Sequence, residues 1–266
     1  MKTISQWLAA VVVAGFVTSS FGQIILQNNF DGNAGNDIGP AFTQFNNGVG
    51  SLATNNTDPA TGLISFARVG TSGTPSVGLV SEIGINAGAG GFTVTWVVNS
   101  ASANINPHAN GWFFGVQTNN IGLWNAGSGN VNGAVGLRIS QTELLEYVVN
   151  PSTGVSATAL TAAQDFSDLA DGFTVSLTLN NNNTWSATTA GLTYDVSTGG
   201  SLVGITYSDF ASSLYASTFL QFGLQNQQMW AQYDSVTITA VPEPTAMSLI
   251  ACAGAAILFI RRRRMM

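Results

Sequence analysis

Two glutamates stand close enough in the chain to suggest acid–base chemistry. Glu143 and Glu146 enclose two leucines in the segment E-L-L-E. A glycosidase needs two carboxyl groups about 5–9.5 Å apart across the bond that it cleaves. Residues three apart on a strand face opposite sides of the sheet, so an extended E-L-L-E cannot aim both carboxyl groups into one cleft. We therefore expect no catalytic residues and no enzymatic activity.

His108 is the one histidine of the sequence, and Cys252 is the one cysteine. A multi-histidine metal centre is thereby excluded, and a catalytic triad would depend on His108 alone. His108 lies in the polar segment I-N-P-H-A-N-G, where a solvent-facing loop histidine is the simpler interpretation. Cys252 lies in an apolar C-terminal segment, so the rest of the chain can form neither an internal disulfide nor a cysteine-based metal site.

The segment F-D-G-N-A-G-N-D near the N-terminus carries oxygen ligands of the kind that calcium prefers. It lacks the spacing and the bidentate glutamate of an EF-hand loop, and turn-forming Asx residues explain it equally well. Calcium is the one cofactor that the sequence suggests. Its candidate ligands are Asp31, Asn33 and Asp37, with Asn36 between them.

Trp124 stands in a segment rich in Gly and Asn, where little could cover it. An indole among amide side chains suits stacking on a sugar ring, and anchoring of the loop is the alternative. An acidic polysaccharide would be repelled by the negative charge described below, so the sugar would be neutral. The tryptophans within or at the end of expected strands belong mostly to the core; these are Trp96, Trp112, Trp185 and Trp230.

Strands must position these residues, because the hydrophobic pattern has a period of two. Residues 92–98, 173–179 and 236–239 alternate apolar and polar side chains, as in F-T-V-S-L-T-L. N-A-G-A-G-G, N-A-G-S-G-N-V-N-G and S-T-G-G-S are typical of turns, and the asparagine run 180–183 predicts a hairpin turn. One short helix is expected near 208–215. Further strands are expected at 24–27, 63–68, 77–82, 112–118, 134–140, 144–149, 184–189 and 218–224.

Charge is scarce and unevenly placed. Of the 266 residues, 8% are charged, and five of the seven Lys and Arg lie at the two ends of the chain. Residues 23–241 hold 12 Asp and Glu against 2 Arg, an excess of 10 negative charges. This segment cannot supply the basic patch that nucleic acid or an anionic lipid surface requires.

The first 22 residues predict a secretory signal peptide. Lys2 precedes an apolar run from Trp7 to Val17, and Ser20 and Gly22 give the small-x-small pattern of a cleavage site. Cleavage after Gly22 would leave Gln23 as the first residue. A retained membrane helix is the alternative, which the shortness of the run disfavours.

The last residues, 241–266, combine three features in order. Pro242-Glu243-Pro244 is followed by the uncharged apolar segment 246–260 and then by a cluster of arginines. A helix over 246–260 spans about 22 Å, which snorkelling and local thinning can fit to a bilayer core of about 30 Å. The arginines predict a cytoplasmic C-terminus and an external body. They are Arg261, Arg262, Arg263 and Arg264.

This tripartite tail resembles the PEP-CTERM signal of bacterial surface proteins. The resemblance implies recognition by an exosortase, an integral-membrane transpeptidase, in a Gram-negative-type envelope. It further implies removal of the tail and release to the cell surface or extracellular matrix after an inner-membrane, single-pass intermediate. A permanent single-pass anchor is the alternative.

The body between the ends resembles the concanavalin A-like, laminin-G-like jelly roll. The resemblance rests on F-D-G-N-A-G-N-D, on F-T-V-T-W-V-V with G-W-F-F-G-V, and on the closing Y-D-S-V-T-I-T. It implies that residues 23–240 form one all-β, antiparallel jelly-roll sandwich whose closing strand lies beside its first. Laminarinase-like members of this fold carry E-x-D-x-x-E on one strand, and this chain lacks that motif.

Two functions of different classes follow from these features. The first is a non-enzymatic protein of the cell surface or extracellular matrix, sorted by an exosortase. The alternative is a lectin-like module that binds neutral exopolysaccharide. Aromatic side chains exposed on a concave sheet face would favour the lectin, and a smooth face of Thr, Ser and Asn would favour the first function.

Overall fold

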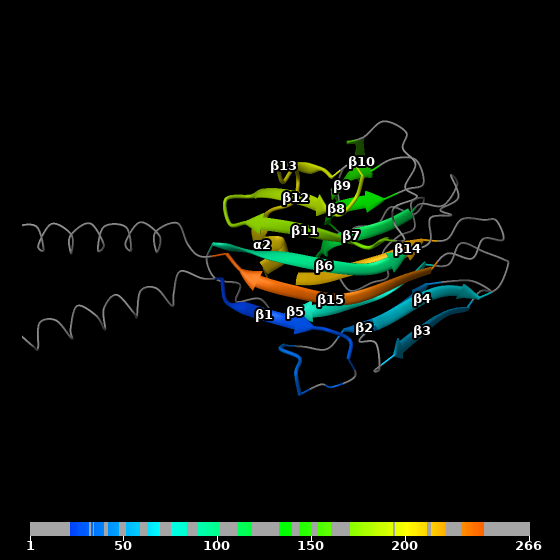
Figure 1. The fold of residues 1–266 in the computed structure, drawn as a ribbon. Coiled ribbons are helices and arrows are strands. Elements are labelled where there is room, and N and C mark those ends of the chain that lie inside the picture. The colour runs from blue at the N-terminus through cyan, green and yellow to red at the C-terminus, as the bar shows by residue number, and fades with distance from the viewer. Residues whose placement is uncertain are drawn as a thin grey trace, which may run out of the picture.

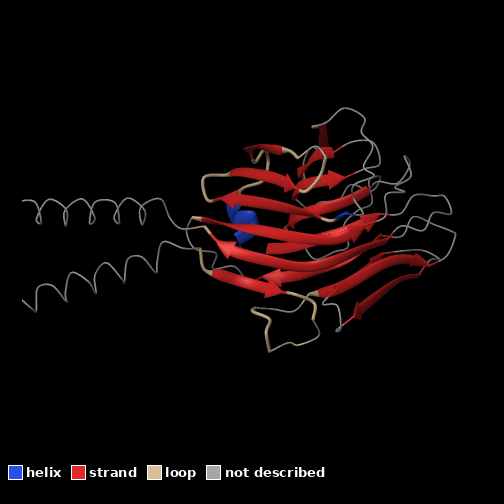
Figure 2. Cartoon of the chain, in the orientation of Figure 1, coloured by secondary structure: helices blue, strands red, loops and turns tan. Residues whose placement is uncertain are grey.

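The chain forms two antiparallel β-sheets that pack face to face, with one short helix between their ends (Figures 1 and 2). The structure is a computed structural model. It describes residues 22–31, 33, 35–39, 42–47, 52–58, 63–69, 76–83, 90–101, 111–118, 133–139, 144–150, 154–160, 171–193, 195–211, 214–221 and 230–241.

An eight-stranded sheet lies in front in Figure 1, in the order β13-β12-β11-β6-β15-β4-β3, with β1 also paired to β15. Its strands are β1 (Ile24–Asn28), β3 (Leu52–Asp58), β4 (Leu63–Val69), β6 (Gly91–Ala101), β11 (Phe173–Asn180), β12 (Thr184–Ala190), β13 (Ser197–Ser201) and β15 (Trp230–Ala240).

A seven-stranded sheet lies behind it, in the order β10-β9-β8-β7-β14-β5-β2. Its strands are β2 (Thr43–Asn47), β5 (Ser76–Ile83), β7 (Gly111–Gln117), β8 (Ala134–Ile139), β9 (Leu144–Asn150), β10 (Gly154–Ala159) and β14 (Leu214–Gln221). The chain crosses repeatedly between the two sheets, so each sheet contains strands from both halves of the sequence.

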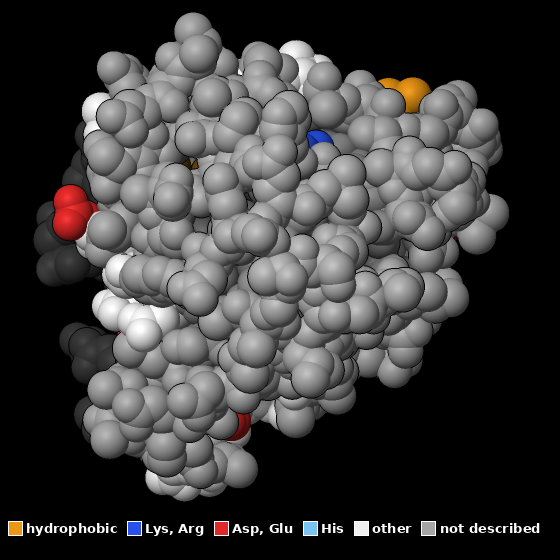
Figure 3. Space-filling view, turned by 90° about the vertical axis from the view of Figure 1, so that its right-hand side faces the viewer, with side chains coloured by type: hydrophobic (Ala, Val, Ile, Leu, Met, Phe, Trp, Pro, Cys, Tyr) orange, Lys and Arg blue, Asp and Glu red, His pale blue; other side chains and the backbone are white. Residues whose placement is uncertain are grey.

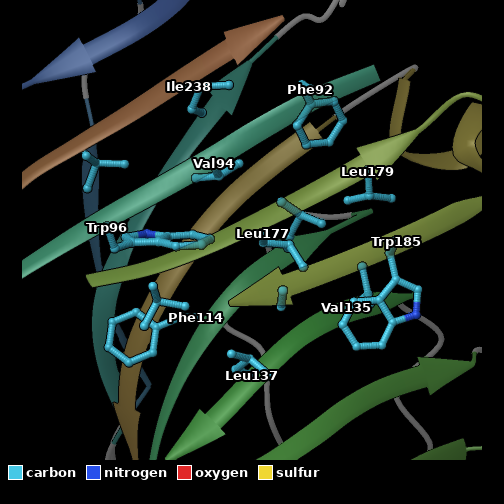
Figure 4. Packing of buried hydrophobic residues seen from close by; sticks show 14 of the residues in the cluster. Phe92, Val94, Trp96, Phe114, Val135, Leu137, Leu177, Leu179, Trp185 and Ile238 are labelled. Atoms are coloured by element: carbon cyan, nitrogen blue, oxygen red, sulfur yellow. The ribbon is translucent and has the colours of Figure 1, made fainter. Parts of the chain in front are cut away.

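The core lies between the sheets and is built by the alternating strands. On β11 the odd-numbered residues from Phe173 to Leu179 are at most 4% exposed, while the residues between them contact solvent. On β6, Trp96 is fully buried, and its indole meets the ring of Phe114 from the opposite sheet at 6.0 Å (Figure 4). Phe114 also packs edge-on against Phe173 at 5.8 Å. The period-two prediction is therefore confirmed for these strands.

The asparagine run forms the predicted hairpin turn between β11 and β12. Asn183 adopts a left-handed backbone conformation, with φ of 62°, which Asn tolerates better than most residues. Its N–H donates to the carbonyl of Asn180 at 3.2 Å, and the side-chain oxygen of Asn182 accepts from the N–H of Thr184 at 3.2 Å. These local bonds explain why four consecutive asparagines make a turn here.

The helix α2 (Tyr207–Ala211) closes one end of the sandwich, behind β6 and β11 (Figure 1). Thr206 caps it, because the Asp209 carboxylate accepts from the Thr206 N–H at 2.7 Å and the Asp209 N–H donates to the Thr206 carbonyl at 3.0 Å. The side chain of Asn183 accepts from the Tyr207 N–H at 2.7 Å, which ties the helix to the hairpin. Phe210 is fully buried in the core.

The structure corrects three predictions. The S-T-G-G-S segment, expected as a turn, is the strand β13, because it pairs along its length with β12. The helix ends at Ala211 instead of extending to Tyr215, since Leu214 already begins β14 and pairs with Ile83. The strands β2, β3 and β10 are additional to those expected.

The closing strand returns beside the first, as expected. Ile24 of β1 pairs with Thr239 of β15, and the Ala240 N–H donates to the Gln23 carbonyl at 2.8 Å. The N–H of Val241 donates to the carbonyl of Gly91 at 2.9 Å, so the ladder holds the chain to its last described residue. Over the described part of the chain, no helix has the length and apolar character that crossing a bilayer requires.

Candidate functional site

Most of the residues singled out from the sequence lie outside the described part of the chain. These are the signal peptide, Trp124, His108, Glu143, the Pro242-Glu243-Pro244 motif and the arginines 261–264. Glu146 belongs to β9, where its backbone pairs with Leu137 on one side and Thr158 on the other. The described candidates are the N-terminal Asx loop, the outer faces of the two sheets and the place where the body begins and ends.

The Asx loop between β1 and β2 contains the proposed calcium ligands. The carboxylate of Asp31 accepts from the N–H of Asn33 at 2.7 Å and from the side-chain amides of Asn29 and Asn36 at 3.1 and 3.2 Å. The N–H of Asn33, followed by the amide of Asn36, holds the pKa of Asp31 below its ordinary value. The Asn33 side chain in turn accepts from the Gly35 N–H at 3.2 Å. Asp31 and Asn33 therefore act as the acceptors of Asx turns.

Calcium stays a prediction for this loop. The observation in its favour is that the Oδ1 atoms of Asp37 and Asn29 are both buried without a hydrogen-bond partner. The described residues contain no group of three His, Cys, Asp or Glu placed to share a metal ion. The hydrogen bonds around Asp31 account for the loop geometry without a cation.

On β6, β11, β12 and the last part of β15, the outer face of the eight-stranded sheet consists mainly of hydroxyl groups, interrupted by Val97 between Thr174 and Ser235. We call these hydroxyl groups the hydroxyl face. Its rows follow the strand register: Thr178 lies opposite both Ser186 and Thr93, and Thr93 lies opposite Thr239. The Thr93 and Thr178 hydroxyls are 2.8 Å apart, and those of Thr95 and Ser176 are 3.1 Å apart. All members are at least partly exposed: Thr93, Thr95, Thr174, Ser176, Thr178, Ser186, Thr188, Ser235, Thr237 and Thr239.

The hydroxyl face was only half predictable from the sequence. The alternation in F-T-V-T and V-T-I-T indicates that these hydroxyls point away from the core. It does not indicate that they line up in rows, because that depends on the register between strands far apart in the chain. The members given above are Thr and Ser alone, so this described part of the face carries neither a charged nor an aromatic side chain.

The outer face of the seven-stranded sheet differs in character. Phe114 of β7 faces the core, so its neighbour Phe113 belongs to the opposite side, yet Phe113 is only 1% exposed. A Cβ at Gly115 would collide with the Phe113 ring, so this glycine leaves the space that the ring occupies. A Cβ at Gly136 would collide with the Phe114 carbonyl oxygen and lie 3.0 Å from the Phe113 ring. The Phe113 ring is therefore already packed, and it is not an open platform for a sugar.

On the face drawn in Figure 3, the described acidic and basic side chains stand singly and apart. Arg138, one of the two arginines of the body, lies half-buried on β8. These residues therefore give no support for binding of a charged ligand through a cluster of charges of the opposite sign.

Comparison with known proteins gives the fold and nothing finer. No protein-family model and no curated protein matches the chain. A crystal structure of a Shewanella oneidensis protein of unknown function aligns with a TM-score of 0.50 and 13% identity, over 85% of this chain and 92% of that one. At this identity the similarity supports a shared fold alone.

Two further solved structures are more distant. Arcelin-5, a lectin-like defence protein from Phaseolus vulgaris, aligns with a TM-score of 0.49 and 13% identity, over 74% of this chain and 97% of that one. A carbohydrate esterase of the Shiga toxin-encoding bacteriophage phi24B gives 0.45 and 11%, over 83% and 99%. Both scores are below 0.5, so neither similarity supports an inference about this chain.

Proposed function

We propose that the chain is an exported, exosortase-sorted, non-enzymatic protein of the cell surface or extracellular matrix, with a jelly-roll body of the concanavalin A-like type. The described sandwich and its returning last strand support the jelly roll. The tripartite tail that resembles the PEP-CTERM signal supports the sorting. The hydroxyl face, which carries neither titratable groups nor aromatic rings, supports a role without catalysis.

The observation that carries the proposal is the meeting of the two ends of the body. The Ala240 N–H donates to the Gln23 carbonyl at 2.8 Å, and the start of β1 and the end of β15 both lie at the left of Figure 1. Before the signal peptide is removed, one membrane segment precedes the body and another follows it, and its removal leaves the single-pass intermediate. Both connections must then face the same membrane, and a body whose ends leave side by side satisfies this requirement without a linker.

The test is the identity of the two ends of the released protein. We expect mass spectrometry of the protein from the extracellular fraction to find Gln23 at the N-terminus and a C-terminus near Val241. Cleavage further upstream would have to break the ladder bond between Val241 and Gly91. Released protein that still contains Arg264 would contradict processing and favour the permanent anchor.

The alternative function, binding of neutral exopolysaccharide, depends on Trp124. If its indole stacks on sugar rings, Trp124→Ala should abolish retention on a neutral glucan or mannan matrix and leave the thermal midpoint unchanged. Trp124→Phe is the matched variant, which keeps a ring and should keep part of the retention. A midpoint lowered by several degrees would identify Trp124 as a packing residue and remove the support for this alternative.

A further inference from the structure

The strand β13 forms an open margin of the eight-stranded sheet. It pairs with β12 from Ser197↔Thr188 to Ser201↔Thr184, and no strand of the described residues pairs with its other side (Figure 1). Four of its five residues are exposed, and Thr198 is partly exposed. This margin is therefore accessible along its whole length.

The hydrogen bonds at the two ends of β13 fix which backbone groups point outward. The Thr189 N–H donates to the Val196 carbonyl at 3.0 Å, and the Leu202 N–H donates to the Asn183 carbonyl at 2.8 Å. Hydrogen-bonded pairs alternate along an antiparallel ladder, so Thr198 and Gly200 also face β12. The remaining three residues direct their N–H and C=O groups away from the sheet; they are Ser197, Gly199 and Ser201.

The usual protections of a sheet margin are missing from β13, apart from its shortness. Edge strands normally carry charged side chains, proline or a bulge, which prevent pairing with another chain. S-T-G-G-S has none of these, and its register with β12 is continuous. The adjacent strand β12 is also uncharged.

We propose that two copies of this chain pair through β13, antiparallel and related by a two-fold axis beside Gly199. The outward residues have the order Ser-Gly-Ser, which is the same in both directions, so a second copy of β13 is a self-complementary partner. Ser197 then lies opposite the partner's Ser201, and Gly199 lies opposite the partner's Gly199. Three such pairs allow about six backbone hydrogen bonds.

The charge distribution permits this pairing despite the negative body. The nearest acidic residue in the sequence is Asp195, four residues before Gly199. In the proposed register Asp195 lies opposite the partner's Val203, and the two Asp195 carboxylates are roughly 27 Å apart along the strands. That separation exceeds the Debye length of about 8 Å at physiological ionic strength. The hydroxyl faces of the two copies would join into one continuous surface.

The register is tested by a disulfide trap in the full chain, purified in mild detergent, with Cys252→Ala as the background. Hydrogen-bonded pairs of an antiparallel ladder have Cα atoms about 5.5 Å apart, which suits a disulfide. We expect the double variant Ser197→Cys, Ser201→Cys to become a covalent dimer on mild oxidation. A bond within one copy is excluded, because residues four apart on a strand are about 13 Å apart.

Three matched variants control for chance collisions. Ser197→Cys alone and Ser201→Cys alone should form no covalent dimer, because each introduced thiol then lies opposite a serine. The double variant Ser186→Cys, Thr188→Cys places two thiols on the same face, one strand inward, and should also form no covalent dimer. Equal cross-linking of this inner pair, or none of the edge pair, would overturn the proposal. Cross-linking of a single variant would overturn the register.

A second measurement needs no introduced cysteine. Sedimentation of the unmodified full chain in detergent should show a dimer fraction that rises with protein concentration. Ser201→Pro removes an outward N–H at a free edge, where proline is tolerated, and should weaken the association at least tenfold. Ser201→Ala keeps that N–H and should leave it unchanged. A chain that stays monomeric at every concentration would overturn the proposal.

Discussion

Replacing Pro242, Glu243 and Pro244 with alanine is expected to leave the full-length protein in the membrane and to abolish its release. The two prolines keep this segment extended and prevent the following helix from growing toward the body. With three alanines, helix is favoured where an enzyme would need an extended peptide. Immunoblotting of membrane and extracellular fractions, with mass determination of each species, measures the effect.

The matched control is Thr245→Ala, which changes the next residue and leaves the tripeptide intact. It should be released like the unmodified protein. Normal release of the triple-alanine protein would show that another feature directs processing, and the proposed function would lose its sorting step. If both variants stayed in the membrane, the loss of release would not be specific to the tripeptide. The prediction that the tripeptide is the signal would then fail.

Trp96→Ala is expected to lower the free energy of unfolding of the body strongly. The Trp96 side chain is fully buried and meets the ring of Phe114 from the opposite sheet (Figure 4). Removal of a buried Trp side chain costs about 3–5 kcal/mol of the free energy of unfolding. For a domain of this size the thermal midpoint should fall by roughly 6–20 °C, as measured by circular dichroism.

Two neighbouring changes make this prediction specific. Thr95→Ala lies beside Trp96 but on the hydroxyl face, where it removes only the contact with Ser176, and it should cost about 1 kcal/mol or less. Trp96→Phe keeps a ring and removes an Nε1–H that is buried without a hydrogen-bond partner, so part of its packing loss is offset. If Thr95→Ala were as damaging as Trp96→Ala, the assignment of the two faces would be wrong.

The strands that the sequence predicts well are those whose pattern is set by burial on one face. In F-T-V-S-L-T-L each apolar residue faces the core, so the alternation is visible without knowledge of any partner strand. The strand β13 has no such pattern, because S-T-G-G-S contains no large apolar side chain. It becomes a strand only through its hydrogen bonds to β12, and a composition of Ser, Thr and Gly is equally typical of a turn.

The candidate sites differ in the same way: one is formed by residues close together in the sequence, and the other by residues far apart. The Asx turns around Asp31 are formed by residues within five positions of one another, so their chemistry can be inferred from the local sequence. The hydroxyl face brings together Thr93 and Thr178, which are 85 residues apart. Its rows depend on the pairing of β6 with β11, and no local pattern contains that information.

By itself the sequence determined the charge balance, the scarcity of chemically reactive residues and the inward or outward direction of side chains on the alternating strands. Each of these is a property of composition or of a few neighbouring residues. Only the tertiary structure decided the register in which β1 meets β15 and the place of β13 at an open margin. Such contacts arise when packing of the whole core offsets the entropy of closing long loops, so they depend on all the strands together.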